Sequence, residues 1–186
     1  MAGGLYLSAR QGDGQLLPER GPMMRWRLMA MAGLGLFGCA VAFSVQAEVG
    51  RKPTAQEIAA IRACAAKYRD DLDEGERKCL FNLVATPCSE RPANAGNLDQ
   101  ADCYRVEWTI WDELLNENFK DLAATLDGEQ MTKLRAMQRA WIAYRDTTCN
   151  FYMDKAQGTM AIPMGNACAA RETARRAMLL KFFQQL

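Results

Sequence analysis

The sequence predicts an all-α fold: a small bundle of antiparallel helices, stapled by disulfides and preceded by a signal-peptide helix. Three observations lead to this prediction. Large apolar residues recur at steps of three and four, which places them on one face of an α-helix. No segment shows the alternation of apolar and polar residues that is typical of a β-strand. Six cysteines follow a segment that resembles an export signal, and an even number of cysteines in an exported chain indicates disulfides.

Residues 23–47 are predicted to be a secretory signal peptide. Arg25 and Arg27 precede an uncharged run, which ends in small residues just before a cleavage point after Ala47. Residues 1–22 are predicted to be a disordered extension or to reflect a mis-assigned start. Two alternatives stay open: the run persists as a membrane anchor, or Cys39 carries a lipid. The run also has G-x-G-x-x-G spacing, but without the strand-to-helix turn that binds a dinucleotide.

Residues 48–85 are predicted to form an N-terminal helical hairpin. Thr54 stands three residues before Glu57, which is the spacing of a capping box, and the helix that it opens is expected to continue to about residue 69. A cluster of aspartates then interrupts the chain, and a second short helix is expected over residues 74–83. The acidic cluster lacks the glycine and the spaced oxygen ligands of a calcium-binding loop, so a solvated turn is expected there.

Residues 86–186 are predicted to form a second helical domain. A loop with two prolines over residues 86–97 is followed by long helices over residues 98–126 and from residue 129 onward, with a short break between them. An apolar loop at residues 154–166 and a last helix over residues 167–183 complete the chain. The first long helix has an apolar stripe of Tyr104, Trp108, Trp111, Leu115, Phe119, Leu122 and Leu126. The second has a stripe that we expect to be buried: Leu134, Met137, Trp141, Tyr144, Thr148 and Phe151.

The six cysteines of the exported chain are predicted to form three disulfides; they are Cys64, Cys79, Cys88, Cys103, Cys149 and Cys168. Six cysteines allow 15 pairings, and the sequence alone does not select one. Pairing of successive cysteines is favoured because each bond then closes a short loop. Each disulfide is expected to stabilise the fold by about 2–4 kcal/mol. No C-x-x-C spacing occurs, which disfavours a redox-active dithiol and a zinc ribbon.

The composition argues against several classes of function. The chain has no histidine, which excludes Ser-His-Asp and Cys-His catalytic groups and the common zinc sites that contain histidine. Residues 48–186 carry 19 basic and 20 acidic residues, so there is no electrostatic case for binding nucleic acid. We therefore predict no catalytic residue, no cofactor-binding residue and no metal ligand, and we expect a protein that is not an enzyme.

Three motifs in residues 86–186 together resemble the LprI-like family, named after the N-terminal domain of the lysozyme inhibitor LprI. The central motif contains Gln138, Arg139, Trp141, Ile142, Tyr144, Arg145, Asp146 and Cys149. The downstream motif contains Cys168, Thr173, Arg176 and Leu180, and the upstream motif contains Asp112, Leu115, Asn116 and Phe119. Cys88 and Cys103 are similar to the first cysteine pair of the family. Cys64 and Cys79 lie outside the resemblance, in an added hairpin.

The resemblance implies a small helical domain that is secreted into the periplasm or beyond, or anchored by a lipid. It also implies lysozyme inhibition, so a protein such as lysozyme is the expected partner, with membrane contact only through an uncleaved signal segment. The alternative is an enzyme or a small-ligand-binding protein that acts on an envelope component. The motif residues Asn116, Gln138, Trp141, Arg145, Asp146 and Arg176 are expected to be mainly structural.

Four features are candidates for contact with a ligand or partner. Arg145 is expected to form a structural ion pair with a nearby acid, and an anion site is the alternative. One of the adjacent Arg175 and Arg176 is expected to face inward. The loop at residues 154–166 contains exposed apolar side chains, which often mark contact surfaces. The loop at residues 89–97 is the other candidate. Either Arg91 or Lys155 could reach the catalytic carboxylates of a glycoside hydrolase.

Overall fold

The structure is a computed structural model that describes residues 50–186, and every regular element in that range is helical. The elements are α1 (Ala55–Lys67), α2 (Leu72–Cys79), α3 (Ala85–Ser89), the 3-10 turn η1 (Pro92–Asn94), α4 (Asn97–Ala123), α5 (Gly128–Ala156) and α6 (Ala161–Phe183). The all-α prediction is therefore confirmed for these residues. The predicted signal peptide, Cys39 and the glycine motif lie outside the described residues.

Capping boxes fix the starts of two helices. The Thr54 side chain accepts a hydrogen bond from the Glu57 backbone N–H, and the Glu57 carboxylate accepts one from the Thr54 backbone N–H. Asp127 and Gln130 make the same reciprocal pair at the start of α5. Each box satisfies backbone donors that have no partner within the helix. The start of α1 therefore lies where the sequence predicts it.

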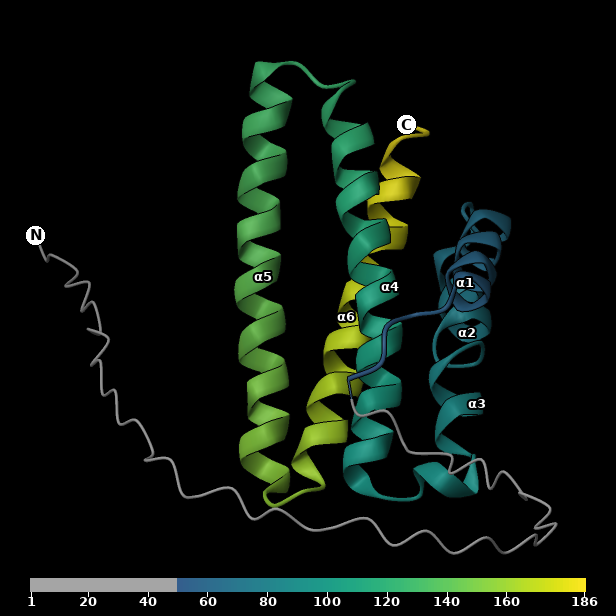
Figure 1. Ribbon diagram of the computed structural model, residues 1–186. Helices are drawn as coiled ribbons and strands as arrows, with labels where there is room; N and C mark the ends of the chain where they lie inside the picture. The colour runs from purple at the N-terminus through teal and green to yellow at the C-terminus, as the bar shows by residue number, and fades with distance from the viewer. Residues whose placement is uncertain (1–49) are drawn as a thin grey trace, which may run out of the picture. The chain divides into compact units, whose positions relative to one another are not determined.

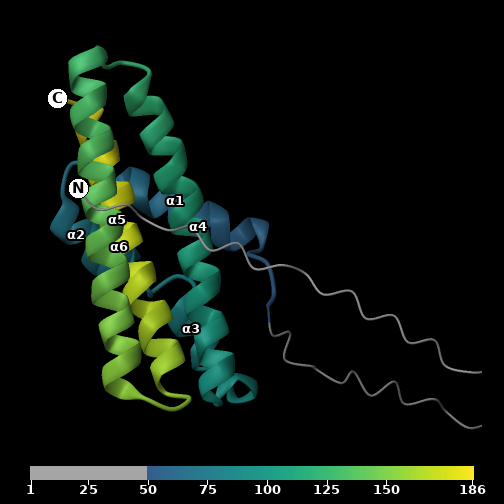
Figure 2. The ribbon, with the colours of Figure 1, turned by 90° about the vertical axis from the view of Figure 1, so that its left-hand side faces the viewer.

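The helix α6 is central to the bundle. Figure 1 shows α4 and α5 as long antiparallel helices joined at one end, with α6 packed against both and α1–α3 on the opposite side from α5. The view turned by 90° shows α1 crossing the direction of the long helices (Figure 2). Small residues make this central position possible, because they let helix axes approach closely. The buried alanines of α6 are Ala161, Ala169, Ala170, Ala174 and Ala177.

The main core lies between α4, α6 and the N-terminal helices. Trp111 and Ile110 of α4, Ile61 of α1 and Leu180 of α6 are almost fully enclosed. Trp111 is the largest of the fully buried side chains. The predicted stripe of the first long helix therefore does form a core face.

Three disulfides hold the helices together. Cys64–Cys79 joins α1 to α2, Cys88–Cys103 joins α3 to α4, and Cys149–Cys168 joins α5 to α6. The Cα atoms of the three pairs are 5.7, 5.6 and 5.4 Å apart, which is the usual range for a disulfide. This is the pairing of successive cysteines that the short loops favour. The boundary between two domains at residues 85 and 86 stays a prediction.

Two segments that the sequence predicts to be loops are partly helical. The region of residues 86–97 contains most of α3 and all of η1, and the expected loop over residues 154–166 is reduced to residues 157–160. Pro163 is compatible with helix there because it lies in the first turn of α6, where backbone N–H groups have no partner within the helix. Within residues 50–186, none of the helices combines the length and the apolar character that crossing a membrane requires.

Candidate functional site

Two tryptophans and two arginines from three helices meet beside the Cys149–Cys168 disulfide; we call Trp108, Trp141, Arg145 and Arg176 the Trp–Arg cluster. The guanidinium carbon of Arg145 lies 5.0 Å from the centre of the Trp141 ring and 6.0 Å from the Trp108 ring. That of Arg176 lies 5.7 Å from the Trp141 ring. Cations at these distances are attracted to the faces of aromatic rings. The packing of α6 against both α4 and α5 is what brings these distant residues together.

Arg145 forms the ion pair with a nearby acid that the sequence predicts, and the acid is Asp146. Its side chain is 16% exposed, and its Nε and Nη2 atoms lie 2.9 and 2.7 Å from the Asp146 carboxylate. Asp146 is 52% exposed, so the pair lies at the rim of the cluster rather than inside it.

Arg176 is the inward-facing member of the adjacent arginines, and Arg175 is exposed. The Nε atom of Arg176 donates to the Gln138 side chain of α5. Its Nη2 atom is buried and has no hydrogen-bond partner. Burial lowers the pKa of Arg176. A guanidinium nevertheless stays protonated near neutral pH, so this is a buried cation.

Trp108 connects the cluster to the disulfide. Its side chain packs against Cys149, Cys168 and Ala169, and its indole Nε1 atom is buried without a hydrogen-bond partner. Next to it is a hollow of about 290 Å³, which is lined by Trp108, Arg145, Asp146, Cys149, Asn150, Met153, Gly165, Asn166 and Ala169. An unfilled indole donor next to a hollow is an arrangement that an acceptor group can complete.

Asn116 lies apart from these contacts. Its side chain donates to the backbone carbonyl and the carboxylate of Asp112, one turn earlier on α4. It is exposed and bonds within its own helix. The structure thus brings Gln138, Trp141, Arg145 and Arg176 together and leaves Asn116 outside the group.

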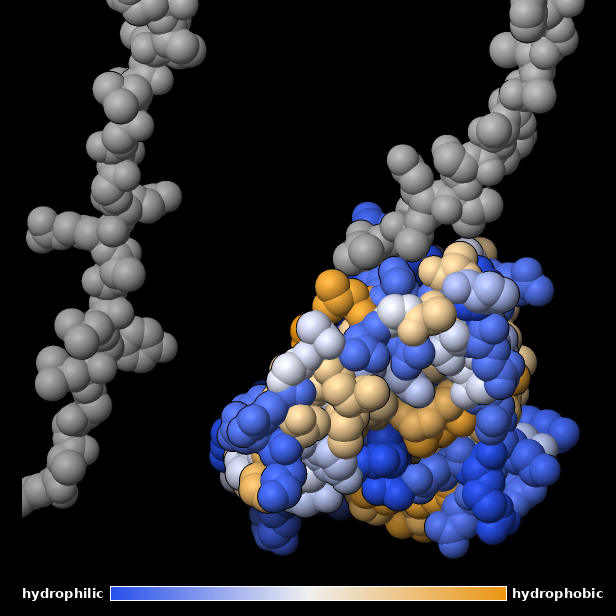
Figure 3. All heavy atoms as spheres, turned by 90° about the horizontal axis from the view of Figure 1, so that it is seen from below, coloured by the Kyte–Doolittle hydropathy of each residue, from blue (hydrophilic) through white to orange (hydrophobic). Residues whose placement is uncertain are grey.

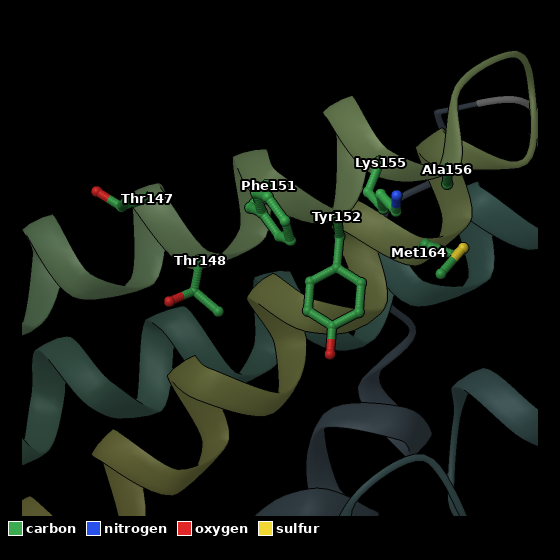
Figure 4. Close-up of a pocket in the computed structure, with 7 residues that line it drawn as sticks. All are labelled: Thr147, Thr148, Phe151, Tyr152, Lys155, Ala156 and Met164. Carbon is green, nitrogen blue, oxygen red and sulfur yellow. The ribbon is translucent and has the colours of Figure 1, made fainter.

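The second candidate surface is at the end of the bundle where α5 turns into α6; we call Phe151, Tyr152, Lys155, Met160 and Met164 the apolar corner. Phe151 is 67% exposed and Met160 is 52% exposed. A groove of about 600 Å³ lies here, and Figure 4 shows Phe151, Tyr152 and Lys155 reaching it from α5 and Met164 from α6. The space-filling view from this end shows apolar side chains exposed among polar ones (Figure 3).

The buried stripe predicted for α5 is partly wrong. Leu134 is buried, but Tyr144 is 54% exposed and Phe151 lies on the open surface. The physical reason is that α6 lies between the two long helices, so α5 packs mainly on one neighbour. A helix with one neighbour buries a narrow strip, and the outer part of its apolar stripe stays in contact with solvent.

The model of the family described as lysozyme inhibitor LprI matches residues 88–180 of this chain. The chain belongs to the LprI family. The match includes the Trp–Arg cluster, the apolar corner and two of the three disulfides, whereas α1 and α2 precede it. Neither the curated proteins nor the solved structures give a significant match. The family description names lysozyme inhibition.

The other loop considered for the LprI-family chain is less distinctive. Glu90 and Arg91 are exposed next to η1, and they line neither the groove of the apolar corner nor the hollow beside Trp108. Among residues 50–186 there is also no group of three or more histidine, cysteine or acidic side chains placed to hold a metal ion. Of the two cations considered for contact with a glycoside hydrolase, Lys155 alone lies at an apolar surface.

Sequence reasoning missed Glu107, a fully buried acid of α4. One carboxylate oxygen accepts from the Phe81 backbone N–H at 2.7 Å and from the Trp111 indole at 3.1 Å. The other accepts from the Ala85 backbone N–H at 2.9 Å. Burial raises the pKa of Glu107, and the three donors oppose the rise. The only signal in the sequence is an acid next to the apolar stripe of the helix, one turn before Trp111; its two backbone partners lie 22 and 26 residues earlier.

Proposed function

We propose that this chain is an exported, non-catalytic protein that binds a lysozyme and blocks its substrate cleft. Membership of the LprI family supports the partner class. The exposed apolar corner is the structural observation that carries the proposal, because apolar groups that the rest of residues 50–186 leaves exposed are typical of contact surfaces. The disulfide between Cys149 and Cys168 holds this end of α5 against α6, so little conformational freedom is lost on binding.

The chemistry of the corner fits the cleft of a glycoside hydrolase. Such a cleft contains two carboxylates that act on the glycosidic bond. Phe151 and Met160 supply apolar contact area, and Lys155 supplies a positive charge at the same place. A lysine surrounded by apolar side chains is drawn toward an acidic partner group and remains paired once water is excluded.

Replacing Phe151 with aspartate is expected to weaken lysozyme binding by about tenfold or more, since exposed aromatic anchors carry a large share of binding energy. The fold should be unaffected because Phe151 is largely exposed. The measurement is calorimetric titration of a panel of lysozymes with the oxidised protein, together with the rate of cell-wall hydrolysis.

The matched control is Ile142→Asp. Ile142 is also exposed on α5, but it is nine residues away, which at about 100° per residue places it on the opposite side of the helix. The control should bind as tightly as the native protein. If no lysozyme is bound or inhibited at stoichiometric protein, the proposed function is wrong. If both variants weaken binding equally, lysozyme binds elsewhere than at the apolar corner.

Export is part of the proposal. Three disulfides within residues 64–168 are typical of a protein in an oxidising compartment. We expect the protein recovered from the periplasm or medium to begin at Glu48, as N-terminal sequencing would show. A mature chain that begins at a lipid-modified Cys39, or one that keeps the whole apolar run in the membrane fraction, would instead support one of the two alternatives.

The catalytic alternative has weak support from one surface hollow. Asp73 and Glu76 of α2 share a hollow of about 640 Å³. Glu76 is held by Arg175 of α6, whose guanidinium nitrogen lies 2.6 Å from its carboxylate. An acid paired in this way is suited to tying α2 to α6 rather than to proton transfer. We therefore do not propose catalysis.

A further inference from the structure

The Trp–Arg cluster contains a buried positive charge with no counter-charge. Arg176 is 7% exposed, and among residues 50–186 no carboxylate lies within ion-pair distance of its guanidinium; Glu172, one turn earlier on α6, pairs with Arg171 and Arg175 instead. Its one side-chain partner is the neutral amide of Gln138. Burying a guanidinium without an anion is costly, and the group does not relieve the cost by losing a proton near neutral pH.

The cluster also has two unused hydrogen-bond donors, Nη2 of Arg176 and Nε1 of Trp108. Both belong to one connected group, because Arg145 lies over the rings of Trp108 and Trp141, and Arg176 lies over the ring of Trp141. Buried donors in folded proteins nearly always have an acceptor. Two donors without an acceptor, beside a cation without an ion pair, are groups to which an anion can bind.

We propose that the Trp–Arg cluster is a binding site for a carboxylate group. Arg145 pairs with Asp146, so Arg176 is the cation of the cluster that has no ion pair, and a single carboxylate would supply one. A phosphate monoester carries close to two negative charges near neutral pH and would leave an excess of negative charge. The two oxygens of a carboxylate match the parallel donors of a guanidinium, and a free lone pair can accept from the indole of Trp108.

The hollow lined by Trp108 and Arg145 reaches the Trp108 side of the cluster, while Trp141 and Arg176 lie outside its lining. Its volume of about 290 Å³ is close to the lower end of the range for small-molecule pockets. Arg145 and its exposed partner Asp146 form the outer wall. Both unused donors are buried, so a carboxylate that enters from the hollow reaches them only if the Arg145–Asp146 pair at its wall moves outward. The site shares no lining residue with the groove of the apolar corner, so the inference does not depend on lysozyme binding.

A carboxylate of this kind is supplied either by the end of a peptide or by an acidic side chain. Three probes separate these sources: N-acetyl-leucine has a terminal carboxylate, N-acetyl-glutamic acid α-amide has a side-chain carboxylate, and N-acetyl-leucinamide has none. The oxidised protein labelled with ¹⁵N is titrated with each probe, and the indole N–H signals of its tryptophans are followed by NMR. We expect one or both carboxylates to move the Trp108 indole signal downfield, because the N–H gains an acceptor, and the amide to leave it in place.

Arg176→Met tests the charge directly. Without a probe, this variant should melt at the same temperature as the native protein or higher, because a buried unpaired charge has been removed. Its affinity for the carboxylate probe should fall by about tenfold or more, as expected from loss of a charge-assisted hydrogen bond. Arg135→Met, a change at an exposed position on α5, is the matched control and should bind the probe normally.

Three results would overturn the proposal. Equal shifts with N-acetyl-leucine and its amide would show that the charge is not recognised. No shift with either carboxylate would show that the cluster binds neither source. A probe-free Arg176→Met variant that melts well below the native protein would show that Arg176 acts as a structural clamp on Gln138.

Discussion

Replacing Glu107 with leucine is expected to lower the free energy of unfolding by about 3 kcal/mol or more. Leucine has a similar volume but accepts no hydrogen bond, so the backbone N–H groups of Phe81 and Ala85 and the indole of Trp111 all lose their acceptor. Each buried donor without a partner costs about 1–3 kcal/mol. Urea unfolding followed by circular dichroism measures the change.

The loss should be concentrated where Glu107 connects parts of the chain. Phe81 has a positive φ of 65°, a backbone conformation that residues other than glycine rarely adopt. Its backbone N–H donates a hydrogen bond to the carboxylate of Glu107. Ala85 begins α3. Hydrogen exchange over residues 80–89 should therefore increase more than exchange in the middle of α5. Uniform exchange across both regions would show that Glu107 does not specifically hold this segment.

Glu107→Gln is the matched variant and also tests the effect of pH. Glutamine keeps one carbonyl oxygen for the Phe81 and Trp111 donors but turns an N–H₂ group toward the N–H of Ala85, so a loss of about 1–3 kcal/mol is expected. Burial raises the pKa of Glu107 above its ordinary value of 4.5, so the folded chain binds more protons than the unfolded chain between these two values.

Stability should therefore fall as the pH rises through that interval, since a raised carboxyl pKa makes the ionised form unfavourable in the folded state. Other carboxyl groups, such as Glu57 with its pKa lowered to about 2, contribute the opposite slope at lower pH. The difference between the native protein and Glu107→Gln isolates the contribution of Glu107. A pH-independent difference between the two would contradict the shift.

The sequence was sufficient for the start of α1 and the core face of α4 because their signals are local. The capping spacing of Thr54 and Glu57 and the apolar period of α4 depend on neighbours within a few residues, and the structure agrees with both. The number of helices that pack against α5 is not a local property. Phe151 is exposed because α6 lies between α4 and α5. The spacing of apolar residues along α5 does not indicate how many helices pack against it.

The candidate site shows the same division. The motif around Trp141 and Arg145 could be found from residue order, and the pairing of Arg145 with an adjacent acid could be expected. The lack of an ion pair at Arg176 could not, because it depends on α6 placing Arg176 next to Trp141 while Glu172, one turn earlier, pairs with Arg171 and Arg175. An inward-facing arginine was predicted from the sequence, but its lack of a counter-charge becomes evident only when all its neighbours are known.

Reducing all three disulfides is expected to unfold the protein at physiological temperature. The bonds close loops with sequence separations of 15, 15 and 19 residues, and each is expected to stabilise the fold by about 2–4 kcal/mol. Their joint contribution of roughly 6–12 kcal/mol is comparable to the whole stability of an ordinary domain, about 5–15 kcal/mol. Circular dichroism with and without a thiol reductant measures the loss of helix.

Removing each disulfide should loosen a different part of the fold. Removing the Cys149–Cys168 bond should weaken lysozyme binding most. Of the residues of α5, only Leu134 and Cys149 are buried, so this bond is the main attachment of the C-terminal half of that helix. The double variant Cys149→Ala with Cys168→Ala should raise hydrogen exchange near Phe151 and weaken lysozyme binding. Cys64→Ala with Cys79→Ala is the control, because it frees α1 and α2, which lie outside the family match. Equal exchange near Phe151 in the two variants would mean that packing on α6, rather than the disulfide, fixes the apolar corner.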